Sequence, residues 1–582
     1  MSDSDSKTGE ISDGLQVELF HPDSDRKPGD TNIEAFGFDI HPIVFPVALG
    51  LVALFIATTI LLGDQAANAY SAVRSFFEGN FGWFYLLSVN VFIVTILYFA
   101  LGKYGTIRIG GVEAEKEFSD FSWMAMLFSA GMGIGLMFYS VSEPLFYFGS
   151  VPGFFGAEAG TGAAASAAMA QTFFHWGFHP WAIYGLVGLG LAFFSYNRGL
   201  PLTFRSIFWP LLGDRIYGWP GHIIDLVTVF ATLFGLSTSL GLGVAQINTG
   251  LSYVGGDMLG IVSIPTGTVP QILLIAVITG IATMSVAAGL NKGVKRLSTL
   301  NLYLMLGLLG FMLVVGPTVF IFGTWVEGLG AYFGNLLSLS FFTGTLGEGG
   351  STVSAWTVFY WAWWIAWSPF VGMFIARISK GRTVREFVMG VLFLPSLFST
   401  LWLSVFGGSA LFNSLQGNGA ALATYNELGQ TVAMFALLEQ FPLGAISGLL
   451  ATLLVVTFFV TSSDSGSLVI DHLTSGGKHD VPKNQRVFWA VTEGAVAALL
   501  LWGGGLNALQ TAAIATGFPF AIVLMLMCVT VYQGLKNEYE ILESDQFAER
   551  IQDMTEDEDI EVVQTGDQVV TDVRGGDVEG TD

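Results

Sequence analysis

Cysteine is almost absent from the 582-residue chain, which has a single one, Cys528. This excludes an intrachain disulfide framework and any metal site built from cysteines. Charged residues are also scarce at 12%, while hydrophobic residues make up 52% and the mean hydropathy is +0.62, a value that soluble domains do not reach. The composition therefore predicts an all-α polytopic membrane protein.

The few charges that exist lie mostly at the two ends of the chain. Of the formal net charge of -23, residues 1–41 contribute -7 and residues 537–582 contribute -14. We interpret both segments as acidic tails, which either a salt-rich cytoplasm or plain solvation would explain. The first apolar run begins only after the 41-residue polar leader, so we expect no cleavable signal peptide.

Long apolar runs dominate the rest of the chain. Runs of roughly 20 residues, bounded by charges or by Gly and Pro, predict twelve transmembrane helices. We place them near residues 42–63, 81–102, 121–146, 164–196, 222–253, 270–290, 299–325, 352–376, 384–407, 442–470, 486–506 and 509–535. Between the seventh and eighth, residues 326–343 are too polar to span the bilayer, and we expect a helix lying in the membrane interface.

The basic residues predict the orientation. Of the 23 Lys and Arg residues, 22 lie in the leader, in the loops after even-numbered spans or in the C-terminal tail, with Arg74 as the exception. Loops rich in Lys and Arg remain in the cytoplasm. We therefore expect a multi-pass protein of the cell membrane with both termini in the cytoplasm.

Two spans contain helix-breaking sequences. Span 3 has Gly131, Gly133 and Gly135 at alternate positions, each of which lowers helix stability by about 1 kcal/mol. This predicts an unwound segment, with close helix packing through small residues as the alternative. Span 8 has Ser368-Pro369 in mid-run, a second predicted break. Interrupted helices five spans apart are typical of two five-helix repeats of opposite orientation around a site near the bilayer midplane.

This five-plus-five inverted repeat divides the chain. We assign residues 42–120 to two extra N-terminal spans, 121–325 to the first repeat (spans 3–7), 326–351 to the interfacial helix and loop, and 352–536 to the second repeat (spans 8–12). The acidic tails, 1–41 and 537–582, flank them.

Four tryptophans lie within residues 360–370 of span 8. At about 100° per residue, Trp361, Trp364 and Trp367 occupy one side of a helix, with Trp363 at its edge. Tryptophans commonly lie at the lipid headgroups, but these are spread over nearly two turns, so several would lie inside the membrane. Indole faces bind quaternary ammonium groups, which have no N–H to donate. Our hypothesis is therefore a buried aromatic box.

Several polar residues lie inside the predicted spans. Thr461, Ser462 and the three residues that follow carry side-chain oxygens in a row. Hydroxyls that bond back to their own helix are the common explanation, but two of them facing an unwound segment would form a hard-oxygen site for a small cation. Glu143 is either a proton carrier or a satisfied structural carboxyl, and we favour the second. His175 and His179 have a spacing that can hold a metal but lack further ligands, so we expect no such site.

Several of these motifs together resemble the betaine/carnitine/choline transporter family, most closely its sodium-coupled glycine betaine permeases. They are residues 131–139 (GMGIGLMFY), 142–144 (SEP), 175–184 (HWGFHPWAIY) and 360–385 (YWAWWIAWSPFVGMFIARISKGRTVR). The resemblance covers all twelve spans and implies a carrier that is typically a homotrimer among membrane lipids. It implies a small zwitterionic or cationic quaternary-ammonium substrate, with no organic cofactor and no nucleic-acid partner.

The resemblance also implies a substrate site. Its aromatic box falls on Trp176, Trp181, Tyr184 and Trp364, while Trp363 and Trp367 match positions along the pathway or near the substrate carboxylate. Positions 176 and 181 diverge by about 140° on an ideal helix, so we expect a kink at Pro180 to bring them together.

The glycines of span 3 favour one kind of substrate. Choline-carrying relatives often have Asp where this chain has Gly135. The backbone N–H groups of Gly133 to Gly135 can instead bind a carboxylate at the positive end of a half-helix. We therefore predict glycine betaine rather than choline.

For the coupling ion, the resemblance implies one sodium between the unwound part of span 3 and span 10. The matching positions are Ser129, Met132, Phe458, Thr461 and Ser462. A second sodium site matches Thr232 and Phe370, but its other threonine is Leu236 here, which makes that site doubtful.

Together these observations predict a secondary active transporter that imports a quaternary-ammonium compatible solute by sodium symport with alternating access. Proton-coupled or exchange transport of choline or carnitine is the alternative. A channel would need a continuous polar lining, and a sensor would need a folded output domain that neither tail has the apolar content to form. Ser465 has no evident His and Asp partners in a recognisable arrangement, so we do not expect an enzyme. The acidic C-terminal tail differs from the basic tails of osmosensing relatives, and anionic lipid would repel it.

Overall fold

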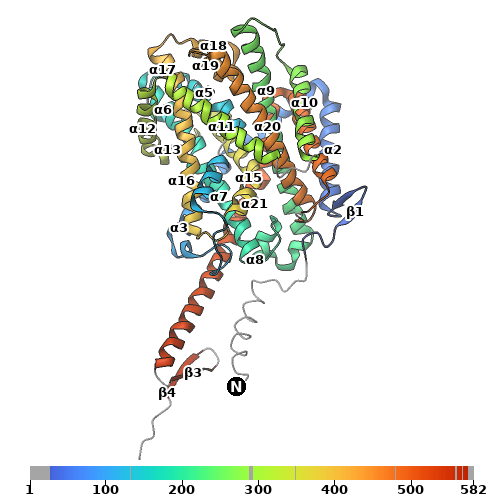
Figure 1. Ribbon diagram of the computed structural model, residues 1–582, viewed down its shortest axis with the longest axis vertical. Coiled ribbons are helices and arrows are strands. Elements are labelled where there is room, and N and C mark those ends of the chain that lie inside the picture. The colour runs from blue at the N-terminus through green and yellow to red at the C-terminus, as the bar shows by residue number, and fades with distance from the viewer. Residues whose placement is uncertain are drawn as a thin grey trace, which may run out of the picture.

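The fold is a bundle of long helices, shown as a computed structural model in Figure 1. The structure describes residues 27–130, 133–287, 293–347, 349–478, 480–557, 560–565 and 568–573. Its helices are α2 (Val44–Leu62), α3 (Ala66–Leu101), α4 (Asp120–Ala130), α5 (Ile134–Gly149), α6 (Gly162–Trp176), α7 (Phe178–Tyr196), α8 (Trp209–Leu212), α9 (Trp219–Ser252), α10 (Thr268–Ala287), α11 (Gly293–Val315), α12 (Thr318–Gly334), α13 (Leu336–Phe341), α14 (Gly350–Thr352), α15 (Phe359–Ile378), α16 (Val384–Leu403), α17 (Ser409–Gln416), α18 (Ala420–Leu428), α19 (Ala433–Leu438), α20 (Gly444–Thr474) and α21 (Lys483–Asp557). Two antiparallel hairpins, β1 (Ile33–Ala35) with β2 (Phe38–Ile40) and β3 (Ile560–Thr565) with β4 (Gln568–Val573), are minor additions.

Each predicted apolar run coincides with helix, so the chain is a helical polytopic membrane protein. Among the described residues, nine segments are long and apolar enough to cross a membrane. Two of them, Val44–Leu101 with 58 residues and Lys483–Ser544 with 62, far exceed the roughly 20 residues that one crossing needs. The second contains non-helical backbone at Gly504 and Gly505, where the φ of +61° at Gly505 favours glycine.

The helices differ in how deeply they are buried. The segments of α6 with α7, of α9 and of α15 are the most buried in the bundle, whereas α2, α10 and α11 expose most of their apolar surface. In a membrane protein such exposed apolar surface faces lipid. Helix α15 packs directly against both α7 and α9, and the three helices lie at the centre of the molecule.

The interruption predicted in span 3 is present. Helix α4 ends at Ala130 and α5 begins at Ile134, and Gly133 between them is fully extended, with φ -171° and ψ -175°. The first backbone N–H groups of α5 therefore have no partners within that helix.

The break predicted at Ser368-Pro369 is wrong, because α15 runs through it to Ile378. Proline removes the hydrogen bond that its own N–H would donate to the carbonyl of Ile365, four residues earlier. The hydroxyl of Ser368 donates to that carbonyl instead, at 2.8 Å. This replacement bond explains how the helix continues.

The kink expected at Pro180 lies instead at Gly177, which separates α6 from α7. The backbone of Gly177 has φ -93° and ψ -132°, outside the helical region. Pro180 falls in the first turn of α7, where its missing N–H leaves no helical bond unmade. A corner rather than a bend therefore brings positions 176 and 181 together.

The end predicted for span 7 also differs from the structure. Helix α11 ends at Val315 rather than near residue 325, and α12 begins at Thr318. Gly316 and Pro317 between them terminate the first helix, as this pair is expected to do. The helix predicted for residues 326–343 is therefore two helices, α12 and α13, the first of which starts earlier than expected.

Part of the expected N-terminal tail docks on the bundle. Asp39 forms an ion pair with Lys478, and its backbone N–H donates to Gln485 Oε1 at 2.9 Å. His41 Nδ1 accepts a hydrogen bond from the N–H of Val44 at the start of α2, and burial lowers the pKa of His41 to about 3. At the other end, α21 continues to Asp557, well into the segment predicted to be a tail.

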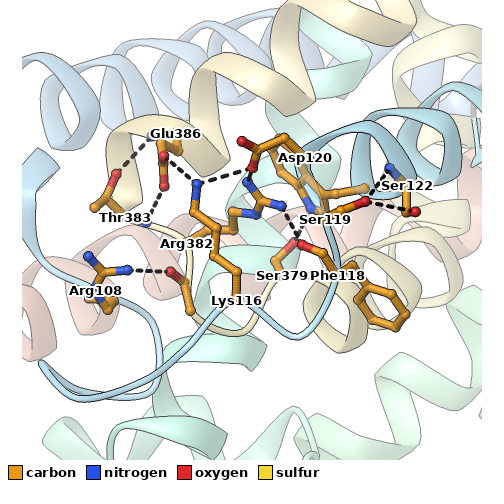
Figure 2. A network of polar contacts seen from close by, with 12 residues as sticks. Arg108, Lys116, Phe118, Ser119, Asp120, Ser122, Ser379, Arg382, Thr383 and Glu386 are labelled. Carbon is orange, nitrogen blue, oxygen red and sulfur yellow. Dashed lines mark hydrogen bonds and ion pairs between the residues drawn. The ribbon is translucent and has the colours of Figure 1, made fainter.

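A polar network joins the start of α4 to the α15–α16 loop (Figure 2). Arg382 contacts Asp120 in an ion pair and donates to the Phe118 carbonyl at 2.8 Å, while Lys116 bridges Asp120 and Glu386 at 3.1 and 3.0 Å. Hydrogen bonds from Arg382 and Lys116 lower the pKa of Asp120. The network fixes the start of α4 against the loop between α15 and α16.

Candidate functional site

A cavity of about 210 Å³ lies among the buried helices. Its walls come from the α4–α5 break, the α6–α7 corner, α11, α15 and α20, with Ser239 of α9 and Ser399 of α16 at its edges. All eight residues predicted to bind substrate line it: Gly133, Gly135, Trp176, Trp181, Tyr184, Trp363, Trp364 and Trp367. The interruptions in the helices therefore lead to one common space.

Aromatic rings form one side of this cavity. Trp176 meets Trp364 edge to face, with ring centroids 4.9 Å apart and planes at 75°. Trp363 stacks on Trp364 at 4.7 Å and 13°, and Trp181 meets Tyr184 at 5.2 Å and 76°. We call these five residues, Trp176, Trp181, Tyr184, Trp363 and Trp364, the aromatic box.

Three indole N–H groups of the aromatic box are already satisfied by the protein. Trp364 donates to the carbonyl of His175 at 3.0 Å, and Trp363 donates to Ser239 Oγ at 3.1 Å. Trp176 donates to Glu143 Oε2 at 2.9 Å. What these rings offer a ligand is therefore their apolar faces, which suit a cation without N–H donors.

The glycine-rich break borders the same cavity. Gly133 caps α5, and residues 133–136 line the space, so the N-terminal end of this helix faces it. A Cβ added at Gly135 would lie 2.6 Å from Cη2 of Trp363 and 3.0 Å from Cη2 of Trp176. Only glycine lets the α5 backbone approach the aromatic box this closely.

Residues that can offer oxygen atoms also line the cavity. Ser129, Phe458, Thr461 and Ser462 line it, as predicted for a cation site, while Met132 lies outside the described residues. The hydroxyl of Thr461 also bonds to its own helix, at 3.0 Å from the carbonyl of Thr457. Back-bonding, the common explanation for a single hydroxyl, is therefore present at Thr461.

Sequence reasoning missed Asn301 of α11. Its Nδ2 donates to Thr461 Oγ1 at 3.2 Å, and its buried Oδ1 has no hydrogen-bond partner in the described part of the chain. Asn301 also lines the cavity. A lone asparagine in the apolar run of span 7 was the signal that could have identified it.

Of the residues predicted for the second sodium site, Phe370 lines the cavity and Thr232 does not. The hydroxyl of Thr232 donates to the carbonyl of Thr228 at 2.7 Å. Leu236 packs on Gly466, where a Cβ would lie 2.3 Å from Leu236 Cδ1. A close contact between α9 and α20 therefore occupies that position.

Other polar residues singled out from the sequence have structural partners. Glu143 is fully buried and accepts hydrogen bonds behind the aromatic box. His179 Nε2 lies 3.2 Å from Asn90 Oδ1, and its ring stacks on Trp361. Among the residues the structure describes, no group of three or more His, Cys, Asp or Glu side chains could hold a metal ion.

Comparison with known proteins gives consistent matches over nearly the whole chain. A family model described as "BCCT, betaine/carnitine/choline family transporter" matches residues 43–540. The chain is 46% identical over 528 residues to glycine betaine transporter 1 of Vibrio parahaemolyticus, covering 88% of this chain and 97% of the relative. A glycine betaine/proline/choline transporter of the same organism is 45% identical over 535 residues, covering 89% and 94%. A probable glycine betaine transporter of Desulfitobacterium hafniense is 44% identical over 499 residues, covering 85% and 98%.

Proposed function

The chain belongs to the betaine/carnitine/choline transporter family, and we propose that it imports glycine betaine by sodium symport. It is a multi-pass membrane transporter and not an enzyme. One observation carries the proposal: an aromatic box in which three indole N–H groups are already satisfied and the N-terminal end of α5 face the same cavity. The two features suit the two ends of a zwitterion.

The trimethylammonium group of the substrate binds in the aromatic box. This group cannot donate a hydrogen bond, so ring faces are its best side-chain partners. The ring planes of Trp176 and Trp364 lie at 75° to one another, and Tyr184 closes a third side with its ring 6.3 Å from that of Trp364. Each desolvated contact contributes on the order of 1–2 kcal/mol.

The carboxylate binds at the start of α5. Backbone N–H groups at a helix N-terminus have no intrahelical acceptor and carry the positive end of the helix dipole. Gly133 and Gly135 leave this end open toward the cavity. An aspartate at position 135, which choline-carrying relatives often have, would clash with Trp363 and place a second negative charge beside the carboxylate.

Sodium, a transported substrate, binds on the oxygen-rich side of the same cavity. The proposed ligands are the carbonyls of Ser129, Met132 and Phe458 and the hydroxyls of Thr461 and Ser462. Hard oxygens are the atoms that such a cation prefers, and no fixed anion is needed. Sodium there would tie α4 to α20 and order the neighbouring glycines, so sodium and substrate would tighten each other's binding by the same factor.

The topology and assembly belong to the proposal as well. We assign twelve crossings in two five-helix inverted repeats, residues 121–325 and 352–536, with two extra helices before them and both termini in the cytoplasm. Helix on every predicted run and basic residues at alternate loops support this. The family resemblance supports a homotrimer.

Choline transport is the second candidate, since a close relative is named as a transporter of glycine betaine, proline and choline. Uptake of labelled solute into proteoliposomes separates the candidates. We expect saturable glycine betaine uptake that is lost when external Na⁺ is replaced by K⁺, and no choline uptake. Uptake that persists in K⁺ and follows an imposed pH gradient would contradict sodium coupling, and choline uptake would contradict the choice of a zwitterion.

A further inference from the structure

A buried carboxylate lies directly behind the aromatic box. Glu143 of α5 is 0% exposed, and its Oε2 accepts hydrogen bonds from Trp176 Nε1 at 2.9 Å and from the hydroxyl of Tyr360 at 2.6 Å. Its Oε1 lies 2.5 Å from His175 Nδ1. Glu143 does not line the cavity, but the indole of Trp176 touches both the carboxylate and the cavity.

The hydrogen bonds of Glu143 suit a carboxylate. The indole N–H of Trp176 and the hydroxyl of Tyr360 both donate to its Oε2, so two donors converge on one oxygen, as an acceptor carboxylate allows. The ring of His175 links Oε1 of Glu143 to Thr357, whose Oγ1 lies 2.9 Å from His175 Nε2.

No Lys or Arg among the described residues forms an ion pair with Glu143. Its one ion-pair contact there is with His175 Nδ1, which lies 2.5 Å from Oε1. The guanidinium of Arg74 is held elsewhere, by Glu78 at 2.7 Å and by Gln510 at 2.6 Å. Three hydrogen bonds offset part of the cost of burying the carboxylate, and a cation on the cavity side of Trp176 would offset more of it.

We propose that Glu143 is the counter-charge of the substrate's quaternary ammonium group and that it acts through the indole of Trp176. The inference rests on the proposed function, which places that group in the aromatic box. An N–H that donates to an anion raises the electron density of its own ring, and the face of that ring then attracts a cation more strongly. The low dielectric of the buried site strengthens the direct attraction in the same direction.

Glu143 therefore determines specificity for the charge of the substrate's head group. Glu143 favours a cationic head over a neutral head of the same shape, beyond what the rings achieve alone. It is also a positioning residue, because it orients Trp176 and Tyr360 directly, and the carbonyl of His175 holds Trp364. The test must therefore separate charge from position.

Glu143→Gln removes the charge and keeps the shape. The amide oxygen can still accept from Trp176 and Tyr360, and His175 can move its proton to Nε2 because Thr357 Oγ1, 2.9 Å away, can accept it. Two probes are compared: glycine betaine, and 3,3-dimethylbutyrate, in which carbon replaces the ammonium nitrogen. We expect the KM for glycine betaine to rise about tenfold, or 1.4 kcal/mol, and the inhibition constant of 3,3-dimethylbutyrate to change less than twofold. Equal weakening of both probes would show a purely structural role and overturn the proposal.

Tyr360→Phe is the matched control, since it removes one hydrogen bond to Glu143 and keeps the charge. The preference for glycine betaine over 3,3-dimethylbutyrate should stay as in the unaltered protein, and a loss equal to that of Glu143→Gln would contradict the charge argument.

Should Glu143→Gln fail to reach the membrane, the unaltered protein still tests the proposal. There 3,3-dimethylbutyrate must inhibit at least about tenfold more weakly than glycine betaine binds, and equal strength would overturn the proposal. Absence of glycine betaine uptake by the unaltered protein would instead refute the proposed function itself.

Discussion

Gly135→Ala tests whether the α5 backbone and the aromatic box share a binding site. The new methyl group would lie 2.6 Å from Cη2 of Trp363 and 3.0 Å from Cη2 of Trp176. Non-bonded carbons prefer roughly 3.5–4.0 Å, so the ring of Trp363 must move by about 1 Å. Trp363 stacks on Trp364 at 4.7 Å, and the two rings would move together toward the cavity, which is the open space beside them.

The magnitude follows from the cost of overpacking. One extra carbon in a well-packed site costs roughly 1–3 kcal/mol. Here the rings can relax into the empty cavity, so we expect the cost to fall on substrate binding rather than on the stability of the protein. By the usual 1.4 kcal/mol per decade, the KM for glycine betaine should rise about fivefold to a hundredfold.

The assay is labelled glycine betaine uptake into proteoliposomes, with tryptophan fluorescence as a second measure of binding. Gly149→Ala is the matched control, because it makes the same change on the same helix where a Cβ meets nothing within 4 Å. Its KM should stay within twofold of the unaltered value. A normal KM in Gly135→Ala, or an equal rise in both variants, would refute the placement of substrate between α5 and the aromatic box.

Three further variants test other parts of the proposal. Trp364→Leu should raise the KM for glycine betaine at least about tenfold, because it removes a desolvated cation–π contact that contributes on the order of 1–2 kcal/mol. Replacing both Thr461 and Ser462 by Ala should raise the sodium concentration for half-maximal uptake severalfold, since two oxygens are lost and the aromatic box is intact. In intact cells, an impermeant maleimide should label Leu346→Cys and should not label Lys380→Cys, if both termini are cytoplasmic.

Each of these has a control within the chain. Trp219→Leu changes a tryptophan that is 61% exposed and should leave the KM unaltered. Thr457→Ala removes a hydroxyl that bonds only to its own helix and should not alter sodium dependence. The parent protein with Cys528 alone should stay unlabelled, because that thiol is buried. Labelling of Lys380→Cys alone would reverse the orientation, and unchanged sodium dependence in the double variant would exclude those hydroxyls as ligands.

The sequence was informative where one local rule decides the structure. Apolar runs placed helices, because a chain in lipid must satisfy its backbone within each segment. Alternating glycines predicted the interruption between α4 and α5, which the structure contains. Ring chemistry suggested an aromatic box, and Trp363, Trp364 and Trp367 do line the cavity. The family resemblance added Trp176, Trp181 and Tyr184, which composition alone could not have assigned.

Predictions failed where a neighbouring residue, or a residue distant in the sequence, changed the local structure. Pro369 did not break α15, because Ser368 occupies the carbonyl that proline leaves free. The corner in span 4 formed at Gly177 rather than Pro180, because proline in a first helical turn costs no hydrogen bond. The partners of Glu143 are 32 to 217 residues away in the chain, so no spacing rule could have paired them.

Helix α5 links the two ends of the proposed substrate site. Its N-terminal end at Gly133 offers N–H groups to a carboxylate, and Glu143 lies eight residues, or about 12 Å of helix rise, beyond Gly135. The indole of Trp176 bridges this interval, with Cη2 3.0 Å from a Cβ position at Gly135 and Nε1 2.9 Å from Glu143. One rigid helix thus presents a positive end and a negative charge in an order that matches the two charges of glycine betaine. Choline, which has no carboxylate, could use only the second, and this is the physical reason to expect a preference for the zwitterion.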